Sequence, residues 1–202
     1  LNVSVRRDGS SRFSPDTRWG IFPAASAAWL ISEEAFLKDS KTVNMLKLRA
    51  GWGVTGQQDG IGDYSYIGNY FQGATTAQYA FGGQYYQVLR PAGFDANLKW
   101  ETTTSYNLGL DFGFKNDRFS GSVDVYQKDT RDLLATVPVP AGTNFTNEIL
   151  TNVGAMQNRG IEASVNTGII AKKDMRLDWS INATYNKNTV VKLSQVVDTT
   201  SP

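Results

Sequence analysis

Apolar and polar side chains alternate without a break along residues 105–114. The even-numbered positions hold tyrosine, leucine or phenylalanine, and the odd-numbered positions hold small or polar residues, Asp111 among them. A period of two predicts a β-strand with one apolar face and one polar face. Ordinary strands have about 5–6 residues, whereas a strand that crosses a bilayer needs about 9–11. The run is therefore typical of a strand with lipid on one side and a watery lumen on the other.

The same alternation recurs along the chain and predicts an all-β fold of about seven antiparallel strands. Pro23 interrupts one of them, and since proline cannot donate to a strand ladder, we expect a bulge or a locally broken pairing there. Another strand places the cations Lys47 and Arg49 on one face, which favours a watery lumen over a packed core. The predicted strands cover residues 1–7, 19–31, 45–55, 102–114, 118–128, 158–171 and 175–188.

Long and short connections alternate between the predicted strands. The connection 32–42 opens with Ser32 and two acids, which predicts a short helical turn capped by this serine. Long loops at one end of the strands and short turns at the other are typical of outer-membrane barrels. The long loops are residues 8–18, 56–99 and 129–157, and the tight turns are residues 115–117 and 172–174.

Aromatic side chains at the apolar positions gather near the ends of the predicted strands. Trp19 and Trp29 lie ten residues apart on one face, which spans roughly 25 Å along the membrane normal for a tilted strand. Aromatic girdles occupy both edges of the lipid band of such barrels. We expect Trp19, Trp52, Tyr106 and Tyr185 on the loop side, and Trp29, Phe112, Phe114, Phe119 and Trp179 on the turn side.

A soluble β-sandwich that binds carbohydrate is the alternative, because alternating strands also build sandwiches and lipocalin-like barrels. Those folds normally use strands of about 5–6 residues. Strand length, aromatic placement and loop asymmetry together favour the membrane barrel.

Composition removes several classes of function. The 202 residues include no cysteine and no histidine, which excludes disulfides, thiolate metal sites and Ser-His-Asp catalysis. Lysine plus arginine number 20 and aspartate plus glutamate 19, so there is no basic field to attract nucleic acid. We therefore expect no enzyme, no metal and no other cofactor. Because the chain begins at Leu1 without a leader, we expect an internal piece of a longer protein.

Several short sequence motifs are more specific than the alternation of apolar and polar residues. Their order and spacing resemble those of the SusC/RagA-type TonB-dependent outer-membrane transporters, and the resemblance runs from Leu1 to about Leu193. The motifs are RDGSSRF at 7–13, WG at 19–20, FP at 22–23, AWLISEE at 28–34, LKLRAGWG at 46–53, LKWETT at 98–103, NVG at 152–154 and NRGIE at 158–162.

The resemblance implies a 22-stranded barrel in the cell outer membrane, with an N-terminal plug and a SusD-like surface lipoprotein as a lid. It also implies import of oligosaccharides, or in some members peptides, with energy passed on by the TonB complex. Residues 1–202 would then be part of one β-barrel domain, from which the plug and the C-terminal strands are absent. Such a segment would contribute barrel wall and outer loops in contact with outer-membrane lipid.

Two groups of residues are candidates for function. Inward polar side chains predict charge networks in the lumen and contacts with the plug, and they are Lys47, Arg49, Asp111, Asp124, Glu162, Arg176 and Asp178. Aromatic side chains in the long loop, most of them tyrosines with a polar tip, suit recognition of sugar or of a partner protein, with packing of the loop on itself as the alternative. They are Tyr64, Tyr66, Tyr70, Phe71, Tyr79, Phe81, Tyr85 and Tyr86.

Three other motifs carry weaker signals. Residues 51–56 match the G-x-G-x-x-G pattern, but a loop rather than a helix follows, so we expect a strand end with little side-chain bulk. Glu33 and Glu34 are adjacent and cannot face one substrate from two sides, as glycoside hydrolysis requires. Asp59 and Asp63 lie in a glycine-rich loop without the EF-hand pattern, which favours loop solubility over calcium binding.

Overall fold

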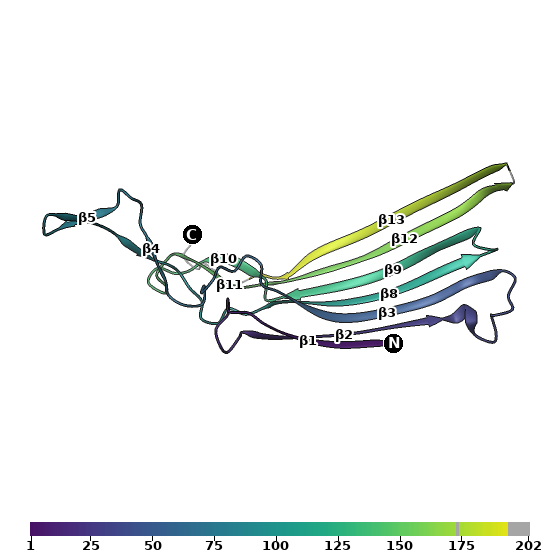
Figure 1. Ribbon diagram of the computed structural model, residues 1–202, viewed down its shortest axis with the longest axis horizontal. Coiled ribbons are helices and arrows are strands. Elements are labelled where there is room, and N and C mark those ends of the chain that lie inside the picture. Colours follow the sequence, from purple (N-terminus) through teal and green to yellow (C-terminus); the bar gives the residue numbers. More distant parts are fainter. Residues whose placement is uncertain (173, 194–202) are drawn as a thin grey trace, which may run out of the picture.

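The computed structural model describes residues 1–172 and 174–193. Its main body is a sheet of seven antiparallel strands in the order β1-β2-β3-β8-β9-β12-β13 (Figure 1). Each long strand pairs with the next one along the chain, so the predicted all-β fold and its seven strands are confirmed. The bounds are β1 (Asn2–Gly9), β2 (Trp19–Leu30), β3 (Val43–Gln57), β8 (Glu101–Phe114), β9 (Phe119–Arg131), β12 (Ala155–Lys172) and β13 (Met175–Lys192).

Most of these strands are longer than the alternation alone predicted. They extend at the end where the long loops lie: β3 continues to Gln57, β9 to Arg131 and β13 to Lys192. The strands from β2 to β13 in this sheet have 12 to 18 residues each. A bilayer needs about 9–11 tilted residues, so the sheet can cross one and still extend beyond it.

The register gathers the apolar residues of neighbouring strands on one face of the sheet. Leu108 lies opposite Ala50 on one side and Val125 on the other, and Val125 lies opposite Ile161. We call this the apolar face. Leu108, Val125 and Ile161 are all exposed on it.

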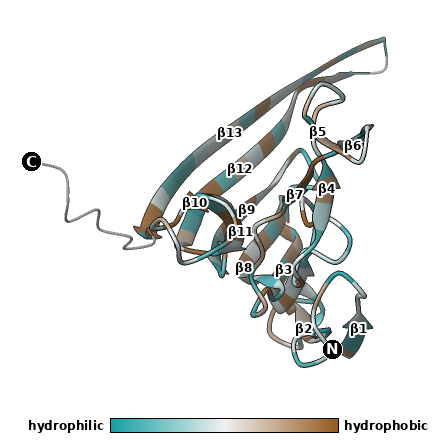
Figure 2. Cartoon of the chain, turned by 90° about the vertical axis from the view of Figure 1, so that its left-hand side faces the viewer, coloured by the Kyte–Doolittle hydropathy of each residue, from teal (hydrophilic) through white to brown (hydrophobic). Residues whose placement is uncertain are grey.

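Polar residues occupy the opposite face, which we call the polar face. Asp111 lies opposite Lys47 and Ser122, and Ser122 lies opposite Ser164. The alternation is visible as brown and teal bands along the long strands (Figure 2). A shift of any strand by one residue would exchange its two faces, so the pattern determines the register.

Aromatic rings on the apolar face cluster at the short-turn end. Phe112, Phe114 and Phe119 stack on one another, with ring centroids 5.7–6.2 Å apart. Thr167 lies between Phe119 and Trp179 at the same level of the sheet. Toward the other end, Trp52 lies directly opposite Tyr106. These positions agree with the two expected aromatic girdles.

Of the two alternatives expected at Pro23, the bulge is absent from the ladder of β1 with β2, and the locally broken pairing is present between β2 and β3. Pro23 lies opposite Val5 in an unbroken register of β1 with β2. The ladder between β2 and β3 begins only at Ala24, which lies opposite Gly53. Pro23 therefore lies just beyond the end of the ladder between β2 and β3, where its missing N–H costs no hydrogen bond between these two strands.

The connections at one end of the sheet are short. The turn between β8 and β9 places Lys115, Asn116 and Asp117 at φ angles of 51°, 56° and 56°. Between β2 and β3, the helical turn is the 3-10 helix η1 (Ile31–Glu33). The expected serine cap was wrong, because Leu30 is the N-cap residue and no side chain caps the helix. In the expected turn 172–174, residue 173 lies outside the described residues. Across the described part of the chain, no helix is long and apolar enough to cross a membrane.

The long connections carry structure that the sequence pattern did not predict. Residues expected to form one long loop contain β4 (Tyr70–Gln72), β5 (Gln78–Phe81), β6 (Gln84–Gln87) and β7 (Leu89–Pro91). The second long loop contains the antiparallel pair β10 (Leu134–Pro138) and β11 (Glu148–Asn152). These elements lie together at one end of the main sheet, opposite the short turns (Figure 1).

The positive φ angle of Lys115, in the turn between β8 and β9, can be tested by substitution. Lys115→Gly removes a side chain from a strained backbone conformation and should leave stability unchanged or raise it by up to about 1 kcal/mol. Lys115→Val puts a β-branched residue there and should lower stability by about 1–2 kcal/mol. The midpoint of thermal unfolding of the full-length protein in detergent measures both effects. Equal midpoints for the two variants would contradict the turn geometry.

Candidate functional site

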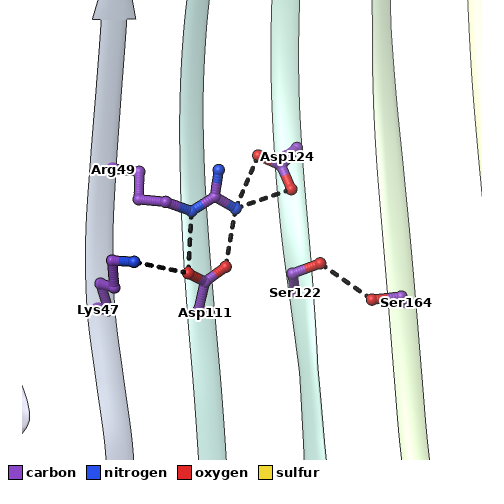
Figure 3. Close-up of polar contacts among 6 residues, drawn as sticks. All are labelled: Lys47, Arg49, Asp111, Ser122, Asp124 and Ser164. Carbon is purple, nitrogen blue, oxygen red and sulfur yellow. Dashed lines mark hydrogen bonds and ion pairs between the residues drawn. The ribbon is translucent and has the colours of Figure 1, made fainter. Parts of the chain in front are cut away.

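Arg49 is the centre of an ion-pair network on the polar face. Its guanidinium donates to both carboxylate oxygens of Asp111, from Nε at 2.9 Å and from Nη2 at 2.7 Å. The same Nη2 donates to Asp124 at 3.1 Å. Lys47 Nζ lies 3.8 Å from Asp111. Figure 3 shows these side chains, which come from β3, β8 and β9, converging above the sheet.

Gly109 makes this network possible. It lies between Arg49 and Asp124 in the register, so the arginine reaches the second carboxylate by crossing over it. A Cβ at position 109 would collide with the Arg49 guanidinium and the Asp124 carboxylate. The glycine therefore leaves a space through which one cation bridges two neighbouring strands.

Hydroxyl pairs continue the polar face beside the network. Ser122 and Ser164 share a hydrogen bond of 2.9 Å between β9 and β12 (Figure 3). Ser180 donates to Asn166 at 2.6 Å between β13 and β12. Such cross-strand pairs stabilise the register and leave a wettable surface.

The structure brings together only part of the predicted polar set. Lys47, Arg49, Asp111 and Asp124 form the network. Glu162 lies opposite Asp124 in the register, but it makes no ion pair within the described residues. Arg176 and Asp178 lie near the short-turn end and pair with each other at 2.7 Å. The roles of these residues toward a plug or a substrate stay predictions.

A hydrophobic cluster lies at the loop end of the sheet, and sequence reasoning missed it. Phe22 points from β2 to the polar face, where the side chains of three separate connections cover it. Trp100 lies against it edge-on, with ring centroids 5.4 Å apart, and Trp100 also packs against Phe13, with ring centroids 5.0 Å apart. We call this group the rim cluster, and its buried members are Phe13, Phe22, Ile61, Leu98 and Trp100.

Gly56 has a packing role beneath the rim cluster. A Cβ at this position would collide with the ring of Phe22 and approach that of Trp100. Residues 51–56 all lie within β3 and no helix begins there, so the G-x-G-x-x-G match belongs to a strand, as expected. The last glycine of the pattern makes room for two aromatic rings.

Hydrogen bonds fasten the loops around the rim cluster. Trp100 Nε1 donates to the carbonyl of Arg18 at 3.1 Å, and Thr17 Oγ1 donates to the carbonyl of Leu98 at 2.6 Å. The Asn152 side chain donates to the carbonyls of Lys99 and Asp132, both at 2.8 Å. Side chains from the β10–β11 pair also pack against the cluster. Loops that are distant in sequence are therefore joined into one rim over the polar face.

The predicted loop aromatics lie outside the rim cluster. Tyr64 and Tyr66 lie in the connection before β4, and the others lie on the strands β4, β5 and β6. Tyr79 and Tyr86 stack on each other with ring centroids 5.6 Å apart. All are exposed except Tyr66, which is half-buried. Their part in binding stays a prediction, and the exposed residues are Tyr64, Tyr70, Phe71, Tyr79, Phe81, Tyr85 and Tyr86.

The acidic residues weighed for other chemistry lie apart. Glu34 accepts a hydrogen bond of 2.8 Å from Trp29 Nε1 at the short-turn end. Asp63 lies 3.5 Å from the Arg12 guanidinium at the loop end. Among the residues that the structure describes, no three acidic side chains gather as a metal ion would require.

Residues 1–201 match the family model described as TonB dependent receptor-like, beta-barrel. The chain belongs to the TonB-dependent receptors. It is 49% identical over 194 residues to TonB-dependent receptor SusC of Bacteroides thetaiotaomicron, covering 96% of this chain and 19% of that protein. It is 39% identical over 200 residues to TonB-dependent receptor P39 of Formosa agariphila, covering 96% of this chain and 18% of that protein.

Solved structures give the same family. The RagAB peptide importer in the open-open state matches this receptor segment with a TM-score of 0.83 and 30% identity, covering 96% of this chain and 20% of that chain. Its closed-closed state matches with a TM-score of 0.78 and 30% identity, covering 95% of this chain and 20% of that chain. The resemblance to the SusC/RagA type and the barrel fold are confirmed, and the β-sandwich is not supported. The chain spans about a fifth of the length of these relatives.

Removing the Phe22 ring from the rim cluster should loosen the receptor's loops. Phe22→Ala takes a buried phenylalanine from contact with Trp100 and should cost about 3–5 kcal/mol locally. We expect faster proteolysis in residues 8–18 and 56–69 of the folded full-length receptor, with an intact barrel. Peptide mapping after limited digestion measures this change. A digestion pattern that matches wild type would show that the cluster does not hold the loops.

The Arg49 network should behave as a coupled unit. Arg49→Ala leaves two neighbouring carboxylates without their shared cation and should lower the free energy of unfolding by about 1–2 kcal/mol. Adding Asp124→Asn should recover part of the loss, because it removes one of the repelling charges. A double-mutant cycle on the full-length receptor measures the coupling. Strictly additive losses would show that the two residues do not interact.

Proposed function

We propose that this chain forms part of the wall and outer loops of a TonB-dependent importer of nutrients in the cell outer membrane. The observation that carries the proposal is the two-faced sheet of long strands, with an exposed apolar face and an ion-paired polar face. The apolar face contacts lipid, and the polar face lines the lumen. The loop end then lies outside the cell, and the short turns lie in the periplasm, as is usual for outer-membrane barrels.

The rim cluster supports a role in controlling the mouth of the lumen. It holds residues from three connections over the polar face, just above β2 and β3. Substrate that reaches the lumen along this part of the wall passes a packed, hydrogen-bonded rim and then the charged surface around Arg49. In this mechanism the outer loops capture substrate, the plug moves, and the substrate passes along the lumen.

We propose oligosaccharides as the substrate, with peptides as the alternative. Support comes from the resemblance of the chain to the SusC/RagA type and from the higher identity to SusC than to the RagAB peptide importer. The proposed partners are a SusD-like surface lipoprotein at the loop end and the TonB complex, which would act through other parts of the protein.

Uptake by living cells tests the proposed function. We would delete the gene for the full-length receptor from the source bacterium and measure growth on single oligosaccharides and on peptides as sole carbon source. Loss of growth on oligosaccharides, restored by the wild-type gene, is expected. Loss of growth on peptides alone would show that peptides are the substrates in place of oligosaccharides. Unchanged growth and uptake on every substrate would contradict a role in import.

Two neighbouring positions on β8 test which face meets lipid. Leu108→Arg places a cation at mid-height on the apolar face and should cost about 2–4 kcal/mol of barrel stability in a bilayer. Asn107→Arg places the same cation on the polar face and should be tolerated. Heat-modifiable migration of the receptor in outer-membrane extracts measures the folded fraction. A greater loss for the Asn107 variant would reverse the assignment of the faces.

A further inference from the structure

A shallow hollow of about 540 Å³ lies on the apolar face, across the neighbouring strands β8, β9, β12 and β13 (Figure 1). Val125 and Ile161 lie opposite each other at its base. Tyr106 of β8 and Tyr185 of β13 border it on the two sides. The hollow forms because two aliphatic side chains lie between two larger rings, and all four side chains are exposed.

The height of the hollow places it at the outer edge of the lipid band. Tyr106 and Phe114 lie eight residues apart on β8, which spans roughly 20 Å along the membrane normal for a tilted strand. Phe114 belongs to the stacked rings at the short-turn end. Tyrosines gather where the acyl chains of a bilayer meet the headgroups. The hollow is therefore at the level of the headgroups on the loop side.

Two cations lie next to each other at the loop-end border of the hollow. Arg159 of β12 lines the hollow itself, and Lys187 of β13 lies directly opposite Arg159 in the register. Both side chains are exposed. Neither takes part in an ion pair with another residue that the structure describes. An apolar hollow thus adjoins positive charge that no carboxylate of the described chain neutralises by direct contact.

An acid on the same face is held by amides instead of by these cations. Asp129 accepts hydrogen bonds of 2.8 Å from the side chains of Gln127 and Gln157, one at each carboxylate oxygen. Arg131 lies two residues beyond Asp129 on β9 and is exposed. With Arg159 and its lysine neighbour, three cations and one carboxylate leave a net charge of +2 on this part of the face.

We propose that the hollow binds an acyl lipid of the leaflet at the loop end through a phosphate of the lipid's headgroup. The inference rests on the proposed function, because it requires the apolar face to lie in lipid. An acyl chain lies on Val125 and Ile161, between the two tyrosine rings. The phosphate accepts hydrogen bonds from Arg159 and Lys187. A guanidinium can bind phosphate through two parallel hydrogen bonds, and basic residues at a membrane surface attract anionic headgroups.

Two other occupants match only part of the site. Inorganic phosphate would use the cations but would leave the apolar hollow uncovered. A second copy of the chain would make a two-fold contact in which the same surface is present on both sides. Such a contact would place the positive charge of one copy against that of the other, which is unfavourable. A phosphorylated lipid matches both the hollow and the charge.

Two single substitutions at neighbouring levels of the sheet test the phosphate contact. Arg159→Gln removes the cation that lines the hollow. Lys128→Gln is the control, because Lys128 is also exposed but lies opposite Asn158 on the polar face. Native mass spectrometry of the full-length receptor in detergent would count retained molecules of diphosphoryl lipid A and of the same lipid without its phosphates. Heat-modifiable migration would verify that each variant is folded.

The Arg159 variant should retain about fivefold less diphosphoryl lipid A than wild type, as expected for one cation near an anionic headgroup. The Lys128 variant should match wild type, and wild type should prefer the phosphorylated lipid. Unchanged retention in the Arg159 variant, equal losses in both variants, or equal retention of the two lipids would overturn the phosphate contact.

Ile161→Trp tests the acyl chain, because it fills the hollow without changing the charge. This variant should also retain less diphosphoryl lipid A, and unchanged retention would show that the cations bind phosphate without the hollow. Receptor dimers in place of lipid-bound monomers would assign the face to a second copy. These outcomes overturn the lipid site alone, since growth on the imported nutrient measures import separately. A wild-type receptor that stays monomeric in water without detergent would refute the membrane placement itself.

Discussion

The register of the long strands is the constraint on which the rest of this structure depends. Because side chains alternate between faces, a slip of one residue would bring Arg49 to the apolar face and Leu48 to the polar face. The bridge from Arg49 to Asp111 and Asp124 links three neighbouring strands at one level. It opposes such a slip on the polar face, while the stacked rings of Phe112, Phe114 and Phe119 oppose it on the other. The two faces therefore support the same alignment by different physical means.

The long strands could be predicted because the alternation that specifies them lies in consecutive residues. In residues 105–114 and 175–188, every second residue reports which face it occupies, and no distant contact is needed to read the pattern. The ion-pair network was half predictable. The alternation of side chains placed Lys47, Arg49, Asp111 and Asp124 on one face. Only the register shows that Arg49 reaches across Gly109 to the carboxylate of Asp124. The alternation places Glu162, Arg176 and Asp178 on the same face. Glu162 makes no ion pair within the described residues, and Arg176 and Asp178 pair with each other away from Arg49.

The rim cluster could not be predicted because it depends on contacts between residues that are far apart in the sequence. Phe13, Phe22, Ile61, Leu98 and Trp100 are single apolar residues in different segments, and none belongs to a periodic run that would mark it as buried. The phenylalanine at 22 even occupies a position that the alternation assigns to the polar face. The hairpin of β5 and β6 is a different case, since Gly82-Gly83 between aromatic runs is a local hairpin signal. The length and glycine content of residues 56–99 concealed that signal.

The inner strands and the border strands of the main sheet differ in what hydrocarbon would cost their backbone groups. In the described part of the chain, β1 and β13 each pair on one side only, and β13 is 18 residues long. Hydrocarbon offers no partner for the backbone N–H and C=O groups along such a border, and each bare group costs several kcal/mol there. A strand that crosses hydrocarbon therefore needs a neighbour on both sides, and within the described residues β2, β3, β8, β9 and β12 meet this requirement.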